Sequence, residues 1–239
     1  MAQTGDDWIY STHRDLTDLA ASRMGLSASG RTVLRRNIIV PDEWGRIDKV
    51  RHYMPLCSFF AGELTREAIR EAATGSSAET RALEKLGHAM HFLQDAGNPW
   101  HARPLLPLVQ KNHRPYEEYV ARNMRDGFCF RRALQKRSAR PNPYAEFTHR
   151  IGDGAAYLAR HAVTRFSFLD RTIRTDPRWQ EREDVAEVTV SILGSCLRMC
   201  ETQIHAFTTR AQPAVPRPVR LPFAVTLTFL GSDKRRLLV

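Results

Sequence analysis

The stretch Gly87–Ala102, GHAMHFLQDAGNPWHA, constrains the fold more than any other part of the chain. On a helix His91 and Asp95 are four residues apart, so their side chains lie on one face and can bind one ion together. Pro99 disfavours helical geometry in the residue before it, so the helix is expected to end there. His101 follows this turn and can approach the same region from another direction. The fold must therefore hold a helix end and the next loop around one site.

A second pair with helical spacing follows at His113 and Glu117, in NHRPYEEYV. Together with His91, Asp95 and His101 this pair makes a set of imidazole and carboxylate groups suited to zinc. Two such pairs and a further histidine just past a helix end are hard to explain by packing alone. We interpret four isolated histidines as core or surface residues instead: His88, His149, His161 and His205.

Apolar residues recur at helical spacing along most of the chain, which predicts an all-α domain. Almost no segment before residue 210 alternates in the way a strand does. The helix that carries His91 has a clear apolar stripe of Leu83, Leu86, Met90 and Leu93. We expect a single multi-helix bundle over residues 1–209, with main helices at about residues 8–24, 59–73, 79–94, 144–166 and 181–207.

Small residues and prolines mark the expected breaks between these helices. Gly25–Gly30 is expected to form a loop, and Pro41–Trp44 a turn that displays carboxylates. The Arg- and Lys-rich segment 122–143 is either a solvated loop or a rim that attracts phosphate groups. Residues 210–239 hold four prolines in AQPAVPRPVRLP and end in a basic run. This Pro-rich C-terminal appendage is expected to form a hairpin or to be disordered.

Composition narrows the class of protein. A hydrophobic fraction of 42% over 239 residues suits a globular chain with a well-buried core. No apolar run reaches the ~18 residues that a transmembrane helix needs, and the N-terminus shows no secretory leader. The four cysteines are too few and too scattered to form a disulfide framework. The net charge of +10 favours contact with polyanions, either nucleic acid or an anionic membrane surface.

Eight histidines and acids follow one another in the order His13, Asp42, His52, His91, Asp95, His101, His113 and Glu117. This set resembles the trinuclear zinc cluster of the bacterial zinc-dependent phospholipase C family, whose relatives include the fungal zinc single-strand nucleases. The most specific part is HFLQDAGNPWHA followed by HRPYE, which is similar to the family's His-x-x-x-Asp, Pro-x-His and His-x-x-x-Glu arrangement. The resemblance covers about residues 8–207 and implies an all-α fold.

The resemblance also implies how the zinc ions would be held. The first zinc would be bound by Asp42, His52, His91 and Asp95. Asp95 would bridge to a second, more labile zinc, which His13 also binds. The third zinc would be bound by His101, His113 and Glu117. The cofactor expected is therefore two to three Zn²⁺ ions.

Two positions in this assignment leave alternatives open. Asp48 is the other candidate for the place of Asp42, because the spacing from Asp42 to His52 is short for the family. The family's labile zinc also binds the amine and carbonyl of an N-terminal tryptophan, for which Trp8 is the candidate. In the chain as given seven residues precede Trp8, so its nitrogen is an amide. Water, the Trp8 carbonyl or Asp7 are the alternatives for that ligand.

By resemblance, the activity is hydrolysis of a phosphodiester, with a phospholipid as the expected substrate. Zinc ions can activate water for such a reaction, and Asp42 could orient or deprotonate that water. In the nuclease branch the second pair reads Asn-Leu-His-x-x-Trp-Asp after a Gly-Gly-Asn segment. This chain has neither and ends the pair with Glu117, which favours the phospholipase branch.

Two other hypotheses remain in view. The net charge of +10 favours the single-strand nuclease, because nucleic acid binding is largely electrostatic. A zinc-binding helical protein without catalysis is the other hypothesis, although a structural zinc is normally closed by four protein ligands, often thiolates. The expected partners are thus a phospholipid or other phosphodiester, an anionic membrane surface, or nucleic acid. Members of the family are usually secreted, but the chain itself indicates no compartment.

Overall fold

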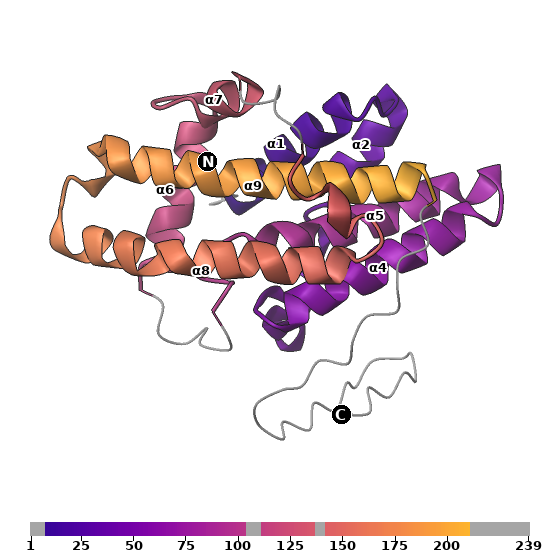
Figure 1. Ribbon diagram of the computed structural model, residues 1–239, viewed down its shortest axis with the longest axis horizontal. Helices are drawn as coiled ribbons and strands as arrows, with labels where there is room; N and C mark the ends of the chain where they lie inside the picture. The colour runs from indigo at the N-terminus through magenta and orange to yellow at the C-terminus, as the bar shows by residue number, and fades with distance from the viewer. Residues whose placement is uncertain (1–7, 104–110, 137–141, 211–239) are drawn as a thin grey trace, which may run out of the picture.

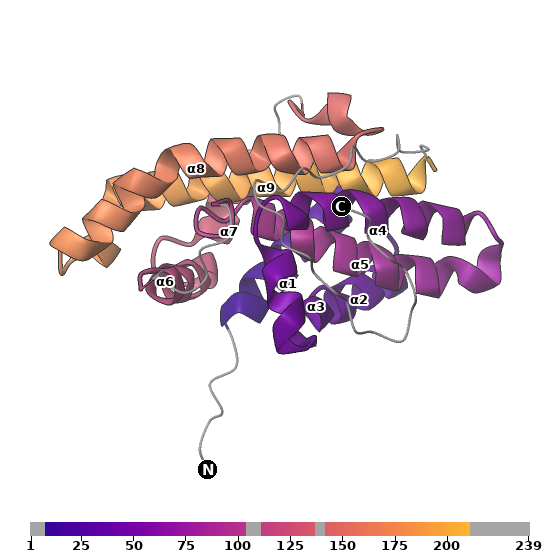
Figure 2. The same ribbon diagram turned by 90° about the horizontal axis from the view of Figure 1, so that it is seen from below.

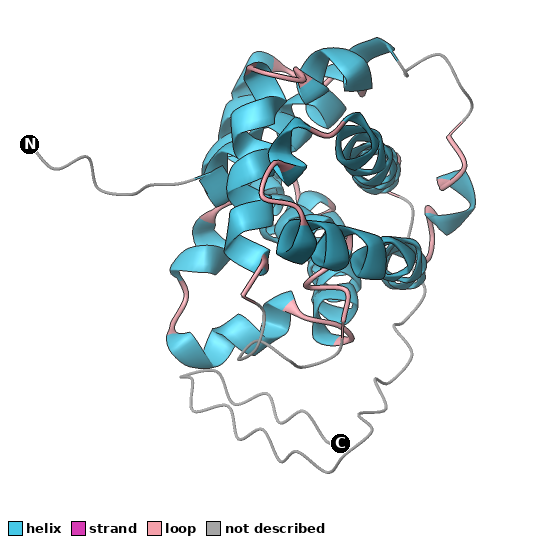
Figure 3. Ribbon diagram, turned by 90° about the vertical axis from the view of Figure 1, so that its left-hand side faces the viewer, coloured by secondary structure: helices cyan, strands magenta, loops and turns pink. Residues whose placement is uncertain are grey.

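The computed structural model describes residues 8–103, 111–136 and 142–210 of the chain. Within these ranges all regular secondary structure is helical, as the sequence predicted (Figure 3). The α-helices are α1 (Trp8–Arg23), α2 (Ala28–Asn37), α3 (Val40–Glu43), α4 (Leu56–Ala72), α5 (Glu79–Ala96), α6 (His113–Arg125), α7 (Phe130–Lys136), α8 (Ile151–Thr175) and α9 (Glu183–Thr208). Short 3-10 helices are η1 (Arg46–His52), η2 (Ser76–Ala78), η5 (Ala145–Phe147) and η6 (Trp179–Glu181). The appendage expected at residues 210–239 lies outside the described residues from position 211 onward.

The long helices α8 and α9 lie side by side along one side of the molecule (Figures 1 and 2). Helices α4 and α5 pack against each other and under this pair, since α4 contacts α8 and both contact α9. Helix α1 lies against α9, α6 and α2, and α2 in turn packs on α5. As a result, α5 is enclosed by other helices and its last turns lie inside the molecule.

Helix α5 brings polar residues into the core. Its predicted apolar stripe is confirmed, because Leu83, Leu86, Met90 and Leu93 are all buried. Every residue of the segment 89–96 is buried, and three of these residues are His91, Gln94 and Asp95. Burying a polar group without a partner costs roughly 1–3 kcal/mol, and a lone charge costs more. The end of α5 is therefore stable only if other elements supply partners for these side chains.

Helix α2 was not predicted, because the segment Gly25–Gly30 suggested a loop. Gly25 does end α1, with φ of 72°, a conformation that glycine adopts without strain. Ser27 then begins a new helix by accepting a hydrogen bond from the backbone N–H of Gly30 at 3.1 Å. The segment predicted as the turn Pro41–Trp44 is likewise helical in part, as the single-turn helix α3 with Pro41 near its start.

The remaining predicted helices are present with shifted ends. Helix α8 begins at Ile151 rather than near residue 144, because residues 145–147 form the separate helix η5. It also continues to Thr175, past the predicted end at residue 166. Helix α9 matches its prediction closely, and its inward residues Val185, Ile192 and Met199 are buried. The core of the bundle is therefore the one that the 3.6-residue periodicity indicates.

The Arg-rich segment at 122–143, expected to be a solvated loop or a phosphate-attracting rim, is largely helical in its described part. Its described part contains the end of α6 and all of α7. Arg125 and Arg131 pair with Asp15 of α1 at 2.9 and 2.8 Å, and Arg131 also pairs with Asp18 at 3.0 Å. Asp15 is only 2% exposed, so these arginines neutralise a buried charge. At least two of the basic residues therefore hold α6 and α7 against α1.

Candidate metal centre

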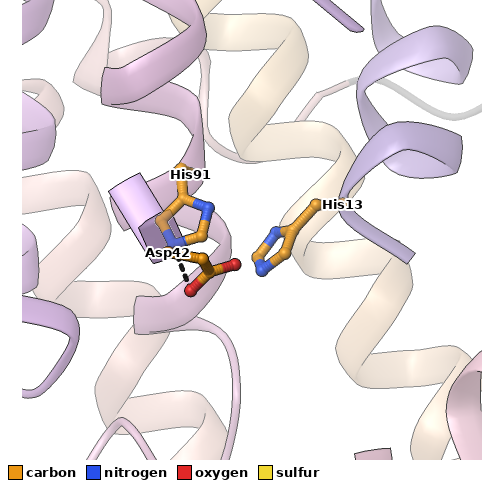
Figure 4. A group of neighbouring side chains, drawn as sticks. All are labelled: His13, Asp42 and His91. Atoms are coloured by element: carbon orange, nitrogen blue, oxygen red, sulfur yellow. Dashed lines mark ion pairs between the residues drawn. The ribbon is translucent and has the colours of Figure 1, made fainter. Parts of the chain in front are cut away.

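Eight side chains that the sequence singled out come together where α1, α5, α6 and the segment 42–52 meet. They form three groups whose ligand atoms lie within 4.8 Å of one another: His13, Asp42 and His91; His52, His91 and Asp95; His101, His113 and Glu117. His91 belongs to two of these groups, so the first two groups are continuous. Figure 4 shows His91 and Asp42 facing each other, with His13 approaching them from α1. The first two groups are therefore parts of one cluster, which the third group joins through His101 and Asp95.

The inner part of the cluster is built around Asp95. Its Oδ2 atom lies 2.7 Å from Nδ1 of His52 and 3.2 Å from Nε2 of His91, and the two imidazole nitrogens are 3.0 Å apart. Oδ1 of Asp42 lies 3.5 Å from Nε2 of His91 and 3.7 Å from Nδ1 of His52. Nε2 of His13 lies 3.6 Å from Oδ1 of Asp95. Both oxygens of Asp95 thus face imidazoles, on two sides of one carboxylate.

The outer part of the cluster combines the turn after α5 with the first turn of α6. Nε2 of His113 lies 2.6 Å from Oε1 of Glu117 and 2.8 Å from Nε2 of His101. Asn98 donates a hydrogen bond to Oε1 of Glu117 at 2.8 Å and so fixes that carboxylate. Nδ1 of His101 is 3.4 Å from Oδ1 of Asp95, which links the outer part to the inner one.

Hydrogen bonds to two backbone carbonyls and to the side chain of Gln94 set the orientation of three imidazoles. Nδ1 of His91 donates to the carbonyl of Ile38 at 2.7 Å, and Nδ1 of His101 donates to the carbonyl of His52 at 3.0 Å. Nδ1 of His13 donates to Oε1 of Gln94 at 2.8 Å. A neutral imidazole that donates through Nδ1 keeps a lone pair on Nε2. In each case Nε2 therefore faces the cluster as a ligand atom, which is the usual arrangement around bound metals.

The charges of the cluster call for a cation. Among the described residues, no lysine or arginine forms an ion pair with its three carboxylates, Asp42, Asp95 and Glu117. Asp95 also lies in the last turn of α5, where the helix dipole disfavours negative charge. Oδ2 of Asp42 is buried and has no hydrogen-bond partner among the described residues. Metal ions would supply the missing charge and partner, so the residues present fit a metal site.

The pKa values of the cluster residues follow from the charges around them. Burial opposes charge on His91 and His101, yet the negative charge of Asp95 raises the pKa of both, that of His101 to about 9. Burial also opposes charge on Asp95, but His91 and His101 hold the pKa of this carboxyl well below its ordinary value. The pKa of His13 is lowered, first by burial and then by His91. Carboxylates and imidazoles thus already stabilise each other before any metal binds.

An open cavity of about 260 Å³ gives access to the cluster. Its walls are formed by Asp42, Lys49, His52, Tyr53, Asp95, His101, His113 and Glu117. Most of these groups belong to the cluster, and Lys49 and Tyr53 are additions that the sequence did not single out. A site that only stabilised the fold would be closed by its own ligands, whereas this one has space beside them. The arrangement can therefore admit a small group to the side chains that could hold a metal ion.

The structure also places the candidates that the sequence left open. Asp42 lies in the cluster, whereas Asp48 pairs with Arg51 at 3.0 Å and belongs to none of the three groups. Trp8 is the first residue of α1, but the side chains described begin at Ser11, so this candidate and Asp7 lie outside them. His88 packs edge-on against Trp44 and belongs to none of the groups, and burial lowers its pKa to about 4.

Sequence reasoning missed the residues that support the cluster. Gln94 binds His13 through Oε1 and donates through Nε2 to Thr17 at 2.9 Å. Asn98 was considered only as a helix end, but it also orients Glu117. The position of Gln94 next to Asp95 is a weak indication that Gln94 supports the cluster. Nothing in the sequence identifies the Ile38 carbonyl as a support, because every residue carries a carbonyl.

Comparison with known proteins adds no relative. No protein-family model matches this chain, and no curated protein matches it either. Among the described helices, none is both long and apolar enough to span a bilayer. The assignment of function therefore depends on the cluster and its cavity.

Proposed function

We propose that this protein is a zinc-dependent phosphodiester hydrolase of the phospholipase C type. The observation that carries the proposal is the convergence of five histidines and three carboxylates beside an open cavity of about 260 Å³, with no basic partner for the carboxylates among the described residues. Imidazole and carboxylate ligands without thiolates are typical of catalytic rather than structural zinc. The resemblance of the ligand order to the phospholipase C family supports the same assignment.

The distances support a division of the cluster into two or three metal positions. His52, His91, Asp95 and Asp42 would hold one zinc, and His13 with Asp95 would hold a second. His101, His113 and Glu117 would hold a third. When bound, zinc ions lower the pKa of water and offset the charge on phosphoryl oxygens. The chain's own residues then have to orient the ions, admit the substrate and move one proton.

Asp42 is the residue that we assign to proton transfer. Its Oδ1 faces His91 and His52, whereas its Oδ2 is buried without a partner among the described residues. The carboxylate can accept the proton of a water molecule that attacks phosphorus and can return it to the alkoxide that leaves as the P–O bond breaks, since a carboxylate at hydrogen-bond distance is a suitable general base. Asp42 also lines the cavity, so the substrate can reach it. Asp42 is thus both a ligand and the proposed catalytic base.

The proposed substrate class is a phospholipid. The second ligand pair ends with Glu117, whose Oε1 lies 2.6 Å from Nε2 of His113, and not with the aspartate of the nuclease branch. A single-strand nuclease is the second candidate function, and the net charge of +10 favours it. Metal binding without catalysis is the third, and the open cavity beside the ligands weighs against it.

The test uses one zinc-reconstituted preparation for all measurements. We expect two to three zinc ions per chain, hydrolysis of phosphatidylcholine vesicles, and little hydrolysis of single-stranded DNA. Hydrolysis of DNA alone would replace the phospholipase assignment by the nuclease. Less than one zinc per chain, or no hydrolysis of either substrate, would overturn the proposal.

A matched pair of variants tests the role of Asp42. Asp42→Asn should abolish hydrolysis, because an amide oxygen accepts a proton far less readily than a carboxylate. Asp48→Asn removes an acid from the same region that pairs with Arg51 and lies outside the three groups, so it should leave hydrolysis close to normal. Equal activity in the two variants would show that Asp42 is not the base.

A further inference from the structure

Two of the residues that line the cavity are not part of the metal cluster, Lys49 and Tyr53. The ring of Tyr53 stacks on His101, with the ring centroids 4.8 Å apart and an interplanar angle of 17°. Among the described residues that line the cavity, Lys49 is the one positive charge that is not an imidazole.

The 3-10 helix η1 directs Lys49 toward the cluster. In such a helix side chains at positions i and i+3 lie on the same face. Lys49 is three residues before His52, which ends η1 and faces Asp95 at 2.7 Å. The neighbouring pair Asp48 and Arg51 has the same spacing and forms an ion pair at 3.0 Å. The side chain of Lys49 thus shares a face with a metal-binding imidazole, whereas its acidic neighbour is already paired.

Lys49 itself is exposed and forms no ion pair with any residue that the structure describes. An unpaired ammonium at the wall of a cavity can bind an anion that enters it. The carboxylates of the cavity are engaged by the imidazoles and, in the proposed function, by zinc. Lys49 is then left to interact with what enters from solvent.

We propose that Lys49 binds the anionic phosphoryl group of the substrate, and so acts as a substrate-binding residue of the site. This inference rests on the proposed function for the identity of the substrate. An ammonium group is a strong, freely rotating donor for phosphate oxygens. Because the group is exposed, we expect its removal to weaken phosphate binding about three- to fivefold, with the loss mainly in KM.

The experiment measures binding of inorganic phosphate to the zinc-loaded full chain by calorimetry, together with zinc content. Lys49→Ala should raise the dissociation constant about three- to fivefold at unchanged zinc content, and Lys49→Arg should retain most of the affinity. Lys85→Ala is the matched control, because Lys85 pairs with Glu67 at 3.4 Å and does not line the cavity. It should bind phosphate as the unchanged chain does.

Turnover of bis(4-nitrophenyl) phosphate separates this proposal from the proposed function. If the unchanged chain binds phosphate through Lys49 but hydrolyses nothing, the proposed function fails and the phosphate-binding role of Lys49 stands. If the chain hydrolyses the substrate and Lys49→Ala has the same phosphate affinity and KM, the role of Lys49 is refuted. Loss of zinc in Lys49→Ala would refute it as well, because the effect would then come from the metal site.

Discussion

Two buried carboxylates of this protein, Asp15 and Asp95, are neutralised in different ways. Asp15 is 2% exposed and receives ion pairs from Arg125 and Arg131 at 2.9 and 2.8 Å. Asp95 is 3% exposed and faces imidazoles, the nearest being that of His52 at 2.7 Å. Arginine is always charged, whereas an imidazole is charged only when protonated. The chain therefore supplies a permanent positive charge for Asp15. The positive charge beside Asp95 depends on whether the imidazoles are protonated.

This difference separates a structural cluster from a candidate functional one. The Asp15 cluster is complete, since its guanidinium groups already satisfy the carboxylate and join α1 to α6 and α7. The Asp95 cluster has lone pairs directed inward, and Oδ2 of Asp42 is without a partner in the described structure. Buried charge without a fixed counter-ion is costly, so the second cluster is best explained by a ligand that brings positive charge. Substitutions in the two clusters should therefore have different effects.

The largest effect is expected from Asp95→Asn. Both oxygens of Asp95 face imidazoles of the cluster, and an amide cannot bridge two cations as a carboxylate does. We expect the loss of at least one zinc per chain and a fall in hydrolysis of about a thousandfold or more. The measurements are zinc content after reconstitution and turnover of phosphatidylcholine. His161→Ala, which changes a histidine outside the three groups, should alter neither.

Asp15→Asn should have the opposite profile. The amide loses the charge-assisted bonds to Arg125 and Arg131, but both guanidinium groups are partly exposed and can be solvated. We expect the free energy of unfolding to fall by about 2 kcal/mol, with zinc content and turnover retained. Urea unfolding of the zinc-loaded protein gives the first quantity. Loss of zinc in this variant would mean that the two clusters are not independent.

The parts of the fold that could be predicted are those with a strong apolar stripe. Helix α5 has such a stripe, and its buried face was predicted from the sequence. Helix α2 lacks one, because only Gly30 and Leu34 of its residues are buried. It is a helix because Ser27 caps it and because it packs on α5. Neither cause is easy to recognise in the sequence. The cap is a single hydrogen bond, and the contact with α5 joins segments that are far apart along the chain.

The same limit applies to the candidate site. The pairs His91–Asp95 and His113–Glu117 were predictable because helical spacing is local, and the structure has them at 3.2 and 2.6 Å. The support of His13 by Gln94 joins residues far apart in sequence, and the support of His91 by a backbone carbonyl has no residue type to identify it. Local geometry thus predicted the pairs, while the tertiary structure determines their orientation.

The pH dependence of zinc binding sharpens the comparison. The pKa of His101 is raised to about 9, where the negative charge of Asp95 outweighs the effect of burial. Below that pH the ring carries a proton that zinc must displace, so zinc affinity should rise about tenfold per pH unit and level off near the pKa. Arg125, whose pKa the hydrogen bond to Asp15 raises, stays charged throughout. Competition with a chelator between about pH 6.5 and 8.5 measures the slope. A flat profile would show that His101 is not a ligand.

The smallest effect is expected from Gln94→Leu, which leaves every proposed ligand in place. Oε1 of Gln94 accepts a hydrogen bond from Nδ1–H of His13 at 2.8 Å and so keeps the lone pair of Nε2 directed at Asp95. Without that acceptor, His13 can rotate or change tautomer, and the zinc that it shares with Asp95 should bind about tenfold more weakly. A zinc titration should then show one weakened site, with the affinity of the outer group unchanged.

Gln94→Glu keeps an oxygen acceptor for His13 and is the control, so it should retain more zinc than Gln94→Leu. If the two variants lose the same zinc, or if neither loses any, the hydrogen bond from His13 does not set the affinity of this site. In that case the imidazole is held by packing between α1 and α5 alone.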